Sequence, residues 1–337
     1  MKEASFYRKG GKEKVDCLLC ARYCKNIPDG SSGFCGVRKN VNGNLMSLVY
    51  GKPCSVAVDP VEKKPLFHFA PGTQCLSIAT VGCNFRCMHC QNWEISQPQE
   101  ISGDEIPPKE VVEMARACGV SGIAYTYTEP TVFYEYAYDT MKLADKSGLY
   151  NVWVSNGYTA PDAIKQVSKH MDAVNVDIKG DDKFYRKVCA APGIQPVYDA
   201  LLEYKKHKVW TEVTTLMIPG YNNKPSQIKG VVKWVHDNLG PDVPMHFSAF
   251  HPTHRLTDAP STPLKTLEKC HEIARKEGMK WVYLGNVRSG KESTFCPSCG
   301  EVVISRSGYR VSYEGASCPK CGEEVPIAGK KWLKTGK

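Results

Sequence analysis

Apolar and polar positions follow two alternating patterns through the middle of the chain. Between residues 75 and 290, short runs rich in apolar and β-branched residues predict buried strands, because such side chains pack well on a pleated surface. These runs are Leu76–Val81, Ile123–Thr128, Val152–Ser155, Ala173–Ile178, Val209–Leu216, Met245–Ala249 and Trp281–Leu284. Segments with apolar residues at helical spacing lie between most of them and predict amphipathic helices.

Helix signals fit this interpretation. The predicted helix Pro107–Cys118 begins with prolines, and Thr262 is expected to cap a helix whose first residue is Pro263. Val132–Ser147 and Ser226–Asn238 are also amphipathic.

The alternation of strands and helices indicates a parallel sheet with right-handed crossovers. Six or seven strand–helix units are fewer than the eight of a closed barrel. We therefore expect an α/β fold built on a partial TIM-type (β/α)6 barrel, with a doubly wound sheet as the alternative. In either fold, the chemistry belongs at the carboxyl ends of the strands.

Composition and charge narrow the class of protein. The 337 residues are 42% hydrophobic and 23% charged, as in an ordinary globular chain. No apolar run approaches 18 residues, and the first residues lack the apolar segment of a secretory signal, so a cytoplasmic protein without membrane association is expected. The formal charge of +9 falls to about +4 if thiolate-bound metals are present, so nucleic acid is not the expected partner.

The 16 cysteines indicate metal binding, because a reducing compartment favours metal binding over disulfides. Two groups lie near the ends of the chain and one in the middle. They predict metal-binding modules at residues 1–66 and 292–337 around a barrel at 67–291. Two CxxC pairs at the C-terminus predict a zinc ribbon, with iron in a rubredoxin-like site as the alternative, and the unequal N-terminal spacing allows either zinc or an iron–sulfur cluster. The ribbon cysteines are Cys296, Cys299, Cys318 and Cys321, and the N-terminal set is Cys17, Cys20, Cys24 and Cys35.

The middle group, Cys83, Cys87 and Cys90, directly follows the first predicted barrel strand. Three cysteines spaced this way can each bind one iron of a [4Fe–4S] cluster, which leaves the fourth iron open for a substrate. A zinc site completed by His89, or three unliganded thiols, are the alternatives.

The Cx3Cx2C motif, with His89 before its last cysteine and a partial barrel around it, resembles the radical S-adenosylmethionine (SAM) superfamily. The stretch C-N-F-R-C-M-H-C-Q-N-W-E-I-S is similar to the enzymes that activate pyruvate formate-lyase. The N-terminal cysteines with G-F-C-G-V-R, the segment V-D-P-V-E-K-K-P-L-F-H-F and the late CxxC pairs resemble the AmmeMemoRadiSam group. The resemblance covers nearly the whole chain.

The resemblance implies a radical SAM oxidoreductase. Its catalytic residues would be Cys83, Cys87 and Cys90, which hold a [4Fe–4S] cluster that binds and reductively cleaves SAM. The resulting 5′-deoxyadenosyl radical would abstract hydrogen from a substrate. The resemblance also implies a reductant protein of the flavodoxin or ferredoxin type, and association with Memo-type and AMMECR-type proteins.

The family's SAM contacts can be assigned by motif. Its G-G-E-P after the second strand corresponds to a segment here that keeps the glutamate and proline, which gives Thr128 and Glu129. Its D-T-N-G after the third strand corresponds to V-S-N-G, which keeps polar residues but loses the carboxylate. Its D-L-K and a later histidine have counterparts after the fourth and sixth strands. The V-S-N-G segment gives Ser155 and Asn156. The counterpart of D-L-K gives Asp177 and Lys179, and the later histidine is His251.

Simpler interpretations remain for two of these assignments. Asp177 and Lys179 lie on one face of a strand and could form a salt bridge inside the barrel. His251 could be an ordinary loop histidine.

The substrate is left open by the sequence. A backbone glycine of a partner protein is the first hypothesis, by similarity to the activating enzymes. Radical modification of a peptide, an RNA or a small molecule is the second. A non-enzymatic zinc-ribbon adaptor, with a basic tail that could contact nucleic acid, is the third.

Overall fold

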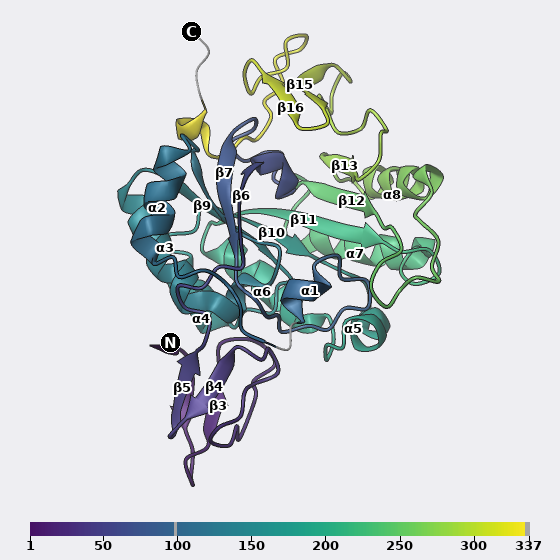
Figure 1. The fold of residues 1–337 in the computed structure, drawn as a ribbon. Helices are drawn as coiled ribbons and strands as arrows, with labels where there is room; N and C mark the ends of the chain where they lie inside the picture. The colour runs from purple at the N-terminus through teal and green to yellow at the C-terminus, as the bar shows by residue number, and fades with distance from the viewer. Residues whose placement is uncertain (98–99, 334–337) are drawn as a thin grey trace.

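An eight-stranded sheet forms the centre of the computed structural model, which describes residues 1–97 and 100–333 (Figure 1). Every predicted barrel strand is present, so the expected α/β fold is confirmed. One strand before them, β6, joins the sheet antiparallel to β7 and was not predicted. The strands are β6 (Ser55–Pro60), β7 (Gln74–Ala79), β8 (Gly122–Tyr125), β9 (Tyr150–Ser155), β10 (Ala173–Asp177), β11 (Trp210–Met217), β12 (Met245–Ala249) and β13 (Val282–Gly285).

The strand order identifies the sheet as a partial barrel. From β7 to β13 the strands pair in parallel and in sequence order. A doubly wound sheet would reverse its order at a switch point, and no such reversal occurs among the described strands. Strands β6 and β13 are the two edges of this sheet.

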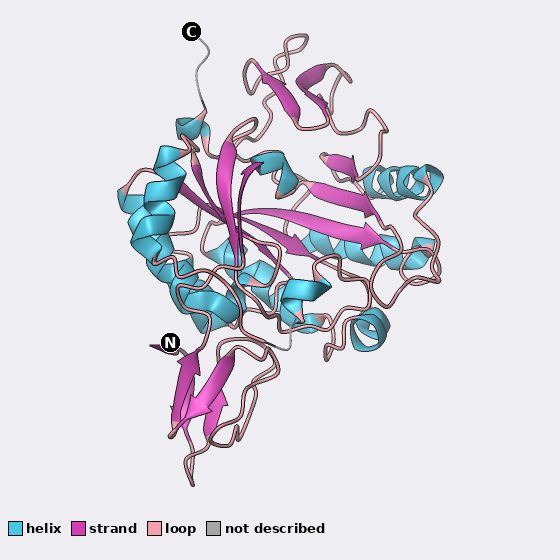
Figure 2. Ribbon diagram, in the orientation of Figure 1, coloured by secondary structure: helices cyan, strands magenta, loops and turns pink. Residues whose placement is uncertain are grey.

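Helices cover the outer face of the sheet (Figure 2). They are α2 (Pro108–Ala117), α3 (Tyr134–Lys146), α4 (Pro161–Val167), α5 (Asp182–Val188), α6 (Gln195–Lys206), α7 (Pro225–Asn238) and α8 (Leu264–Lys276), with short turns α1 (Trp93–Ser96), η1 (Val61–Lys63) and η2 (Pro130–Phe133). The expected cap at Thr262 is wrong. Its hydroxyl donates to the Met217 carbonyl and accepts from the Phe250 N–H, so it ties the ends of two strands together instead. No helix among the described residues is long and apolar enough to cross a bilayer.

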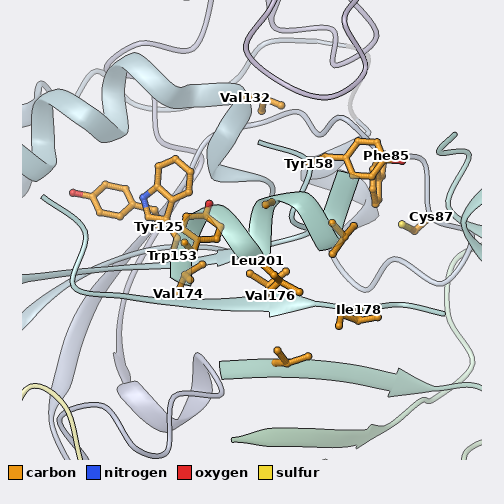
Figure 3. Close-up of a cluster of buried hydrophobic side chains, with 14 of the residues drawn as sticks. Phe85, Cys87, Tyr125, Val132, Trp153, Tyr158, Val174, Val176, Ile178 and Leu201 are labelled. Carbon is orange, nitrogen blue, oxygen red and sulfur yellow. The ribbon is translucent and has the colours of Figure 1, made fainter. Parts of the chain in front are cut away.

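The main apolar core lies between the sheet and these helices. Tyr125, Trp153 and Val176 point outward from successive strands and pack near Leu201 of α6 (Figure 3). Their neighbours in each strand point the other way, into the barrel, because side chains alternate along a strand. The outward residues therefore supply the hydrophobic stability, which leaves the inward positions near the strand ends free to carry polar groups.

Residues 61–70 fill the amino-terminal half of the barrel interior. The buried Glu212 carboxylate accepts the Phe67 and His68 N–H groups at 2.9 and 2.7 Å and contacts His246 Nε2 at 2.7 Å. Asn175 on the adjacent strand donates to the Pro65 carbonyl at 2.8 Å. This segment closes the barrel floor, so the inward-facing chemistry is confined to the opposite half.

The two cysteine-rich ends of the chain lie at opposite ends of the barrel (Figure 1). The N-terminal segment forms a three-stranded sheet and a hairpin and bonds to the loop after β9, where Ala21 N–H donates to the Tyr158 carbonyl at 2.8 Å. The C-terminal strands pack against the barrel floor, where Arg306 donates to the Phe67 carbonyl at 2.7 Å. The elements are β1 (Lys2–Glu3), β2 (Tyr7–Lys9), β3 (Val15–Cys17), β4 (Arg38–Val41) and β5 (Asn44–Ser47), then β14 (Thr294–Phe295), β15 (Val302–Ser307), β16 (Arg310–Tyr313) and η3 (Lys330–Trp332).

Candidate functional site

One cavity of about 580 Å³ opens where the parallel strands end. The loop between β7 and α1 contributes the three cysteines of the Cx3Cx2C motif to its wall. Six of the seven predicted SAM contacts line the same cavity from the ends of β8, β9 and β10. The predicted residues brought together here are Cys83, Cys87, Cys90, Thr128, Glu129, Ser155, Asn156, Asp177 and Lys179.

The cysteine loop is held by backbone hydrogen bonds to the end of α5. Arg86 N–H donates to the Cys189 carbonyl at 3.1 Å, and Met88 N–H donates to the Val188 carbonyl at 2.8 Å. These bonds fix the residues on either side of Cys87, so its sulfur is positioned by the fourth strand–helix unit of the barrel. Regular structure thus constrains a loop that carries the chemistry.

Three cysteine sulfurs in one loop are donors of the kind that bind an iron–sulfur cluster. Burial raises the pKa of the Cys83 and Cys90 thiols, because a thiolate loses its hydration there. The Phe85 N–H donates to Cys83 Sγ at 3.4 Å, and Ser96 Oγ lies 3.1 Å from Cys90 Sγ. A bound cationic cluster would supply the charge that stabilises the thiolates, and such sulfur hydrogen bonds tune its potential. The donor set therefore fits a [4Fe–4S] cluster that leaves one iron without a protein thiolate.

Glu129 organises the site from within and is itself buried. Its Oε1 accepts from Thr131 Oγ1 at 2.6 Å and from Ser155 Oγ at 2.9 Å. Its Oε2 accepts from the Asn156 N–H at 2.8 Å. Burial raises the pKa of this carboxyl, and these hydrogen bonds act in the opposite direction. Both oxygens are engaged by the protein, so Glu129 joins the ends of β8 and β9 rather than presenting a free carboxylate.

Asn156 links this network to the cysteine loop. Its side-chain amide donates to Asn84 Oδ1 at 2.7 Å and lies 3.9 Å from Cys83 Sγ. Its own Oδ1 accepts from the Tyr158 N–H at 3.1 Å. A chain of hydrogen bonds therefore runs from Glu129 through Asn156 to the first cysteine of the motif.

Asp177 and Lys179 face the cavity as a pair. Lys179 Nζ lies 2.7 Å from Asp177 Oδ2. Burial acts to lower the pKa of the Lys179 ammonium, but the Asp177 carboxylate and the neighbouring cysteines outweigh it, so the pKa is raised. The salt bridge exists and both side chains line the cavity, whereas their contact with SAM stays a prediction.

A second polar group, which was missed from the sequence, contributes Lys63, Lys64 and Tyr127 to another wall, and the buried Asp59 behind them holds them together. Asp59 accepts from Lys63 Nζ at 2.6 Å and from the buried Lys64 Nζ at 2.7 Å, and Tyr127 donates its hydroxyl to the same carboxylate. Burial raises the Asp59 pKa, but these donors lower it more strongly, so the net pKa lies below its ordinary value. The run D-P-V-E-K-K-P was the available signal, yet a charge-rich run does not show which of its residues turn inward.

His251 lies apart from the other predicted contacts. It is exposed, its Nδ1 is 3.3 Å from Ser261 Oγ, and it is not among the residues that line the cavity. Other residues that were not predicted line the wall, including Thr214, Ser248 and Asn286 from β11, β12 and the loop after β13. They carry no local motif and are recognised only by their place at the strand ends.

The terminal cysteine groups differ in geometry. The ligand atoms of Cys296, Cys299, Cys318 and Cys321 all lie within 4.8 Å of one another, which makes a metal-binding group. The N-terminal four line a separate cavity of about 20 Å³.

Comparisons with known proteins agree with this site. Residues 77–235 match the model of the radical SAM superfamily. An uncharacterized protein of Methanocaldococcus jannaschii is 49% identical over 309 residues, which are 91% of this chain and 92% of the relative. A second protein of that organism, provisionally named a glycyl-radical enzyme activating enzyme, is 24% identical over 216 residues, covering 63% of this chain and 79% of its own length.

A solved structure shares the fold. Streptococcus suis SuiB bound to S-adenosylmethionine aligns with a TM-score of 0.50 and 11% identity, over 68% of this chain and 53% of SuiB. Residues 77–235, which match the family model, contain the cysteine loop and the ends of β8, β9 and β10 that line the cavity. The chain belongs to the radical SAM superfamily, whose members use a [4Fe–4S] cluster and SAM.

Proposed function

We propose that this protein is an enzyme that cleaves SAM reductively and uses the resulting 5′-deoxyadenosyl radical to abstract hydrogen from a substrate. One observation carries the proposal. The three cysteines of the motif and six polar residues from three strand ends line a single cavity. Its volume of about 580 Å³ lies within the range of about 300–1,000 Å³ typical of small-molecule sites.

Some of these residues would bind the cluster or SAM, and others would position the residues that do. Cys83, Cys87 and Cys90 would hold the cluster, which when reduced supplies one electron to the SAM sulfonium. The Lys179 ammonium would pair with the SAM carboxylate, and Asp177 would accept hydrogen bonds from the ribose hydroxyls. Glu129 and Asn156 would act through their neighbours, because their polar groups are already bonded within the protein.

The electron would come from a reductant protein of the flavodoxin or ferredoxin type. The closed barrel floor supports this mechanism, since a reactive radical needs a cavity that excludes water. The four clustered cysteines of the C-terminal module would bind zinc, because four thiols in this arrangement suit a tetrahedral ion.

For the substrate we propose a backbone glycine of a partner protein. The support is the provisional name of the 24% identical relative, together with the similarity of the cysteine loop to activating enzymes. Association with Memo-type and AMMECR-type proteins, and a cytoplasmic location, stay predictions from the sequence. A candidate partner with deuterated glycine should transfer deuterium to 5′-deoxyadenosine, and a lack of transfer would direct the search to peptides, RNA or small molecules.

The experiment that tests the activity is anaerobic. The reconstituted protein is incubated with SAM and dithionite, and 5′-deoxyadenosine is measured. We expect product from the wild type and from Cys118→Ala, a control at an exposed cysteine outside all three groups, and none from Cys87→Ala. Cleavage by Cys87→Ala at the wild-type rate would refute the assignment. A protein that binds only zinc and makes no product would instead support the adaptor hypothesis.

A further inference from the structure

We propose that a second large cavity, at the end of the barrel away from the cysteine loop, binds a free fatty acid. This cavity has a volume of about 590 Å³, within the range of about 300–1,000 Å³ typical of small-molecule sites. It opens where β10, β11 and β12 begin, since Asp172, Val209 and Pro244 each directly precede one of these strands. It shares no lining residue with the strand-end cavity, so it is a separate site.

The C-terminal residues that form one wall of this cavity are fixed to the barrel at two points. The Ala328 N–H donates to the His68 carbonyl at 2.8 Å. Trp332 Nε1 donates to the Gly148 carbonyl at 2.8 Å. Figure 1 shows this segment, in yellow, at the end of the barrel opposite α1 and α5. The wall is therefore already formed in the protein without a ligand, as is usual for small-molecule sites.

Most side chains that line the cavity are apolar, and the uncharged polar groups beside them are already engaged. Thr211 Oγ1 donates to the Val209 carbonyl at 3.0 Å, and Trp210 Nε1 donates to the Glu212 carboxylate at 3.1 Å. A nucleobase or a sugar would lose water from its polar edges without gaining these groups as partners, whereas a hydrocarbon chain has no such loss. The wall therefore favours a hydrocarbon body. Its apolar residues are Phe69, Val209, Trp210, Leu239, Val243, Pro244, Pro326, Ala328 and Trp332.

Four exposed lysines outnumber the two carboxylates of the cavity and give it an excess of positive charge. Both carboxylates have other partners, because Asp242 Oδ1 lies 3.0 Å from Lys280 Nζ and Asp172 Oδ2 accepts the Asn151 N–H at 2.9 Å. None of the four lysines forms an ion pair within residues 1–97 and 100–333, so the carboxylate of a ligand would meet ammonium groups that are not yet neutralised. These lysines are Lys205, Lys208, Lys330 and Lys331.

The backbone of Lys208 is an independent sign that its side chain has a use. Lys208 is the second residue after α6, and its φ of 58° lies in the left-handed region that favours glycine. The second residue after α5 is Ala190, also with a positive φ. After α2, α3, α7 and α8 the equivalent residues are all glycines, namely Gly119, Gly148, Gly240 and Gly278. Glycine would suit the turn after α6 better than lysine, so a lysine there fits a role for its ammonium group at the cavity.

Burial orders the two kinds of lining group and gives the ligand its orientation. Phe69 and Leu239 are buried, whereas the four lysines are exposed. A hydrocarbon chain would therefore lie inward against the apolar wall, with its carboxylate outward among the ammonium groups. This assignment goes beyond the proposed function and does not depend on SAM cleavage, because the cavity lies at the opposite ends of the strands.

Isothermal titration calorimetry of the full chain with decanoate tests the site, with 1-decanol and ATP as comparison ligands. We expect about one decanoate to bind per chain, and decanol to bind about tenfold more weakly because it lacks the charge. Added salt should weaken the binding of decanoate. ATP should bind more weakly than decanoate, since the wall offers no partners for its base. An absence of saturable decanoate binding, equal binding of decanol, or tighter binding of ATP would each overturn the proposal.

The variant Lys208→Gly separates the ammonium group from the fold. It should keep or raise Tm, because glycine suits the left-handed backbone, and it should weaken decanoate binding about threefold. The matched control Lys233→Ala removes an exposed lysine of α7 outside the cavity and should bind decanoate as the wild type does. Val243→Trp should fill the cavity and abolish binding. Unchanged affinity in Lys208→Gly, or an equal loss in Lys233→Ala, would overturn the proposal even if Val243→Trp does not fold.

Discussion

A buried ion pair joins the N-terminal module to the barrel, and its removal is the sharpest test of how the two are held together. Arg38 of β4 and Glu135 of α3 have side chains only 2% and 3% exposed. Arg38 Nη1 lies 2.8 Å from Glu135 Oε2, and both Nη atoms lie 3.1 Å from Oε1. The Ser5 N–H donates to Oε1 at 2.6 Å, so the carboxylate is fully enclosed.

The variant Glu135→Gln keeps the shape of this contact and removes its charge. With its oxygen at the Oε1 position, the amide keeps the Ser5 bond but directs an N–H₂ group at Arg38 Nη1. The buried guanidinium then lacks its counter-charge, and breaking one partner of such a pair costs about 3–5 kcal/mol. For a chain of 337 residues, that corresponds to a fall in Tm of roughly 4–7 °C.

The measurement is urea or thermal unfolding of the metal-loaded protein under anaerobic conditions. The matched control is Glu277→Gln, which breaks an exposed pair, since Lys229 Nζ lies 2.9 Å from Glu277 Oε1 with the lysine 59% exposed. Such surface pairs contribute about 0–1 kcal/mol. A Glu135→Gln loss within 1 kcal/mol of the control would refute the argument.

The double variant Arg38→Met with Glu135→Leu separates charge from packing. It leaves no unpaired charge, so it should be destabilised less than Glu135→Gln. An equal or larger loss would show that the Ser5 hydrogen bonds and packing, rather than charge, set the cost.

Three further predictions concern the cofactor site, the ribbon and pH. Asn156→Ala removes the 2.7 Å hydrogen bond to Asn84, which neighbours the first cluster ligand. The variant should keep its iron, but the electron paramagnetic resonance of the active-site cluster should shift and 5′-deoxyadenosine formation should slow about tenfold. Unchanged spectra and rate would contradict the role of Asn156. Cys318→Ser should lose the metal of the C-terminal group and lower Tm without lowering iron content, as measured by metal analysis and calorimetry, and retained zinc would contradict it. Burial raises the pKa of Asp172 to about 6 from an unfolded value near 3.8, so this carboxyl favours folding below about pH 4 and loses that contribution as pH rises through 6. Asp172→Asn should therefore gain stability relative to wild type between pH 5 and pH 8, by up to about 2–3 kcal/mol, and a gain that does not depend on pH would contradict this cause.

The barrel strands and the cysteine motif were predictable because both depend on neighbours in the chain. A buried parallel strand is rich in apolar and β-branched residues, and the strands from β7 to β13 show this enrichment along the chain. Strand β6 escaped prediction because it is an edge strand, and most of Ser55–Pro60 is only partly buried. The Cx3Cx2C spacing was equally local, since three ligands of one cluster can come from a single loop.

The sequence by itself thus determined the barrel, the cluster motif and nine of the residues around the cavity. Only the tertiary structure decided how those residues are used. It turned the Glu129 carboxylate toward β9, left His251 outside the cavity and brought Lys63 and Lys64, both paired with Asp59, into the wall. It also brought the four C-terminal sulfurs within 4.8 Å of one another, because spacing along the chain limits which sulfurs can meet but packing decides whether they do.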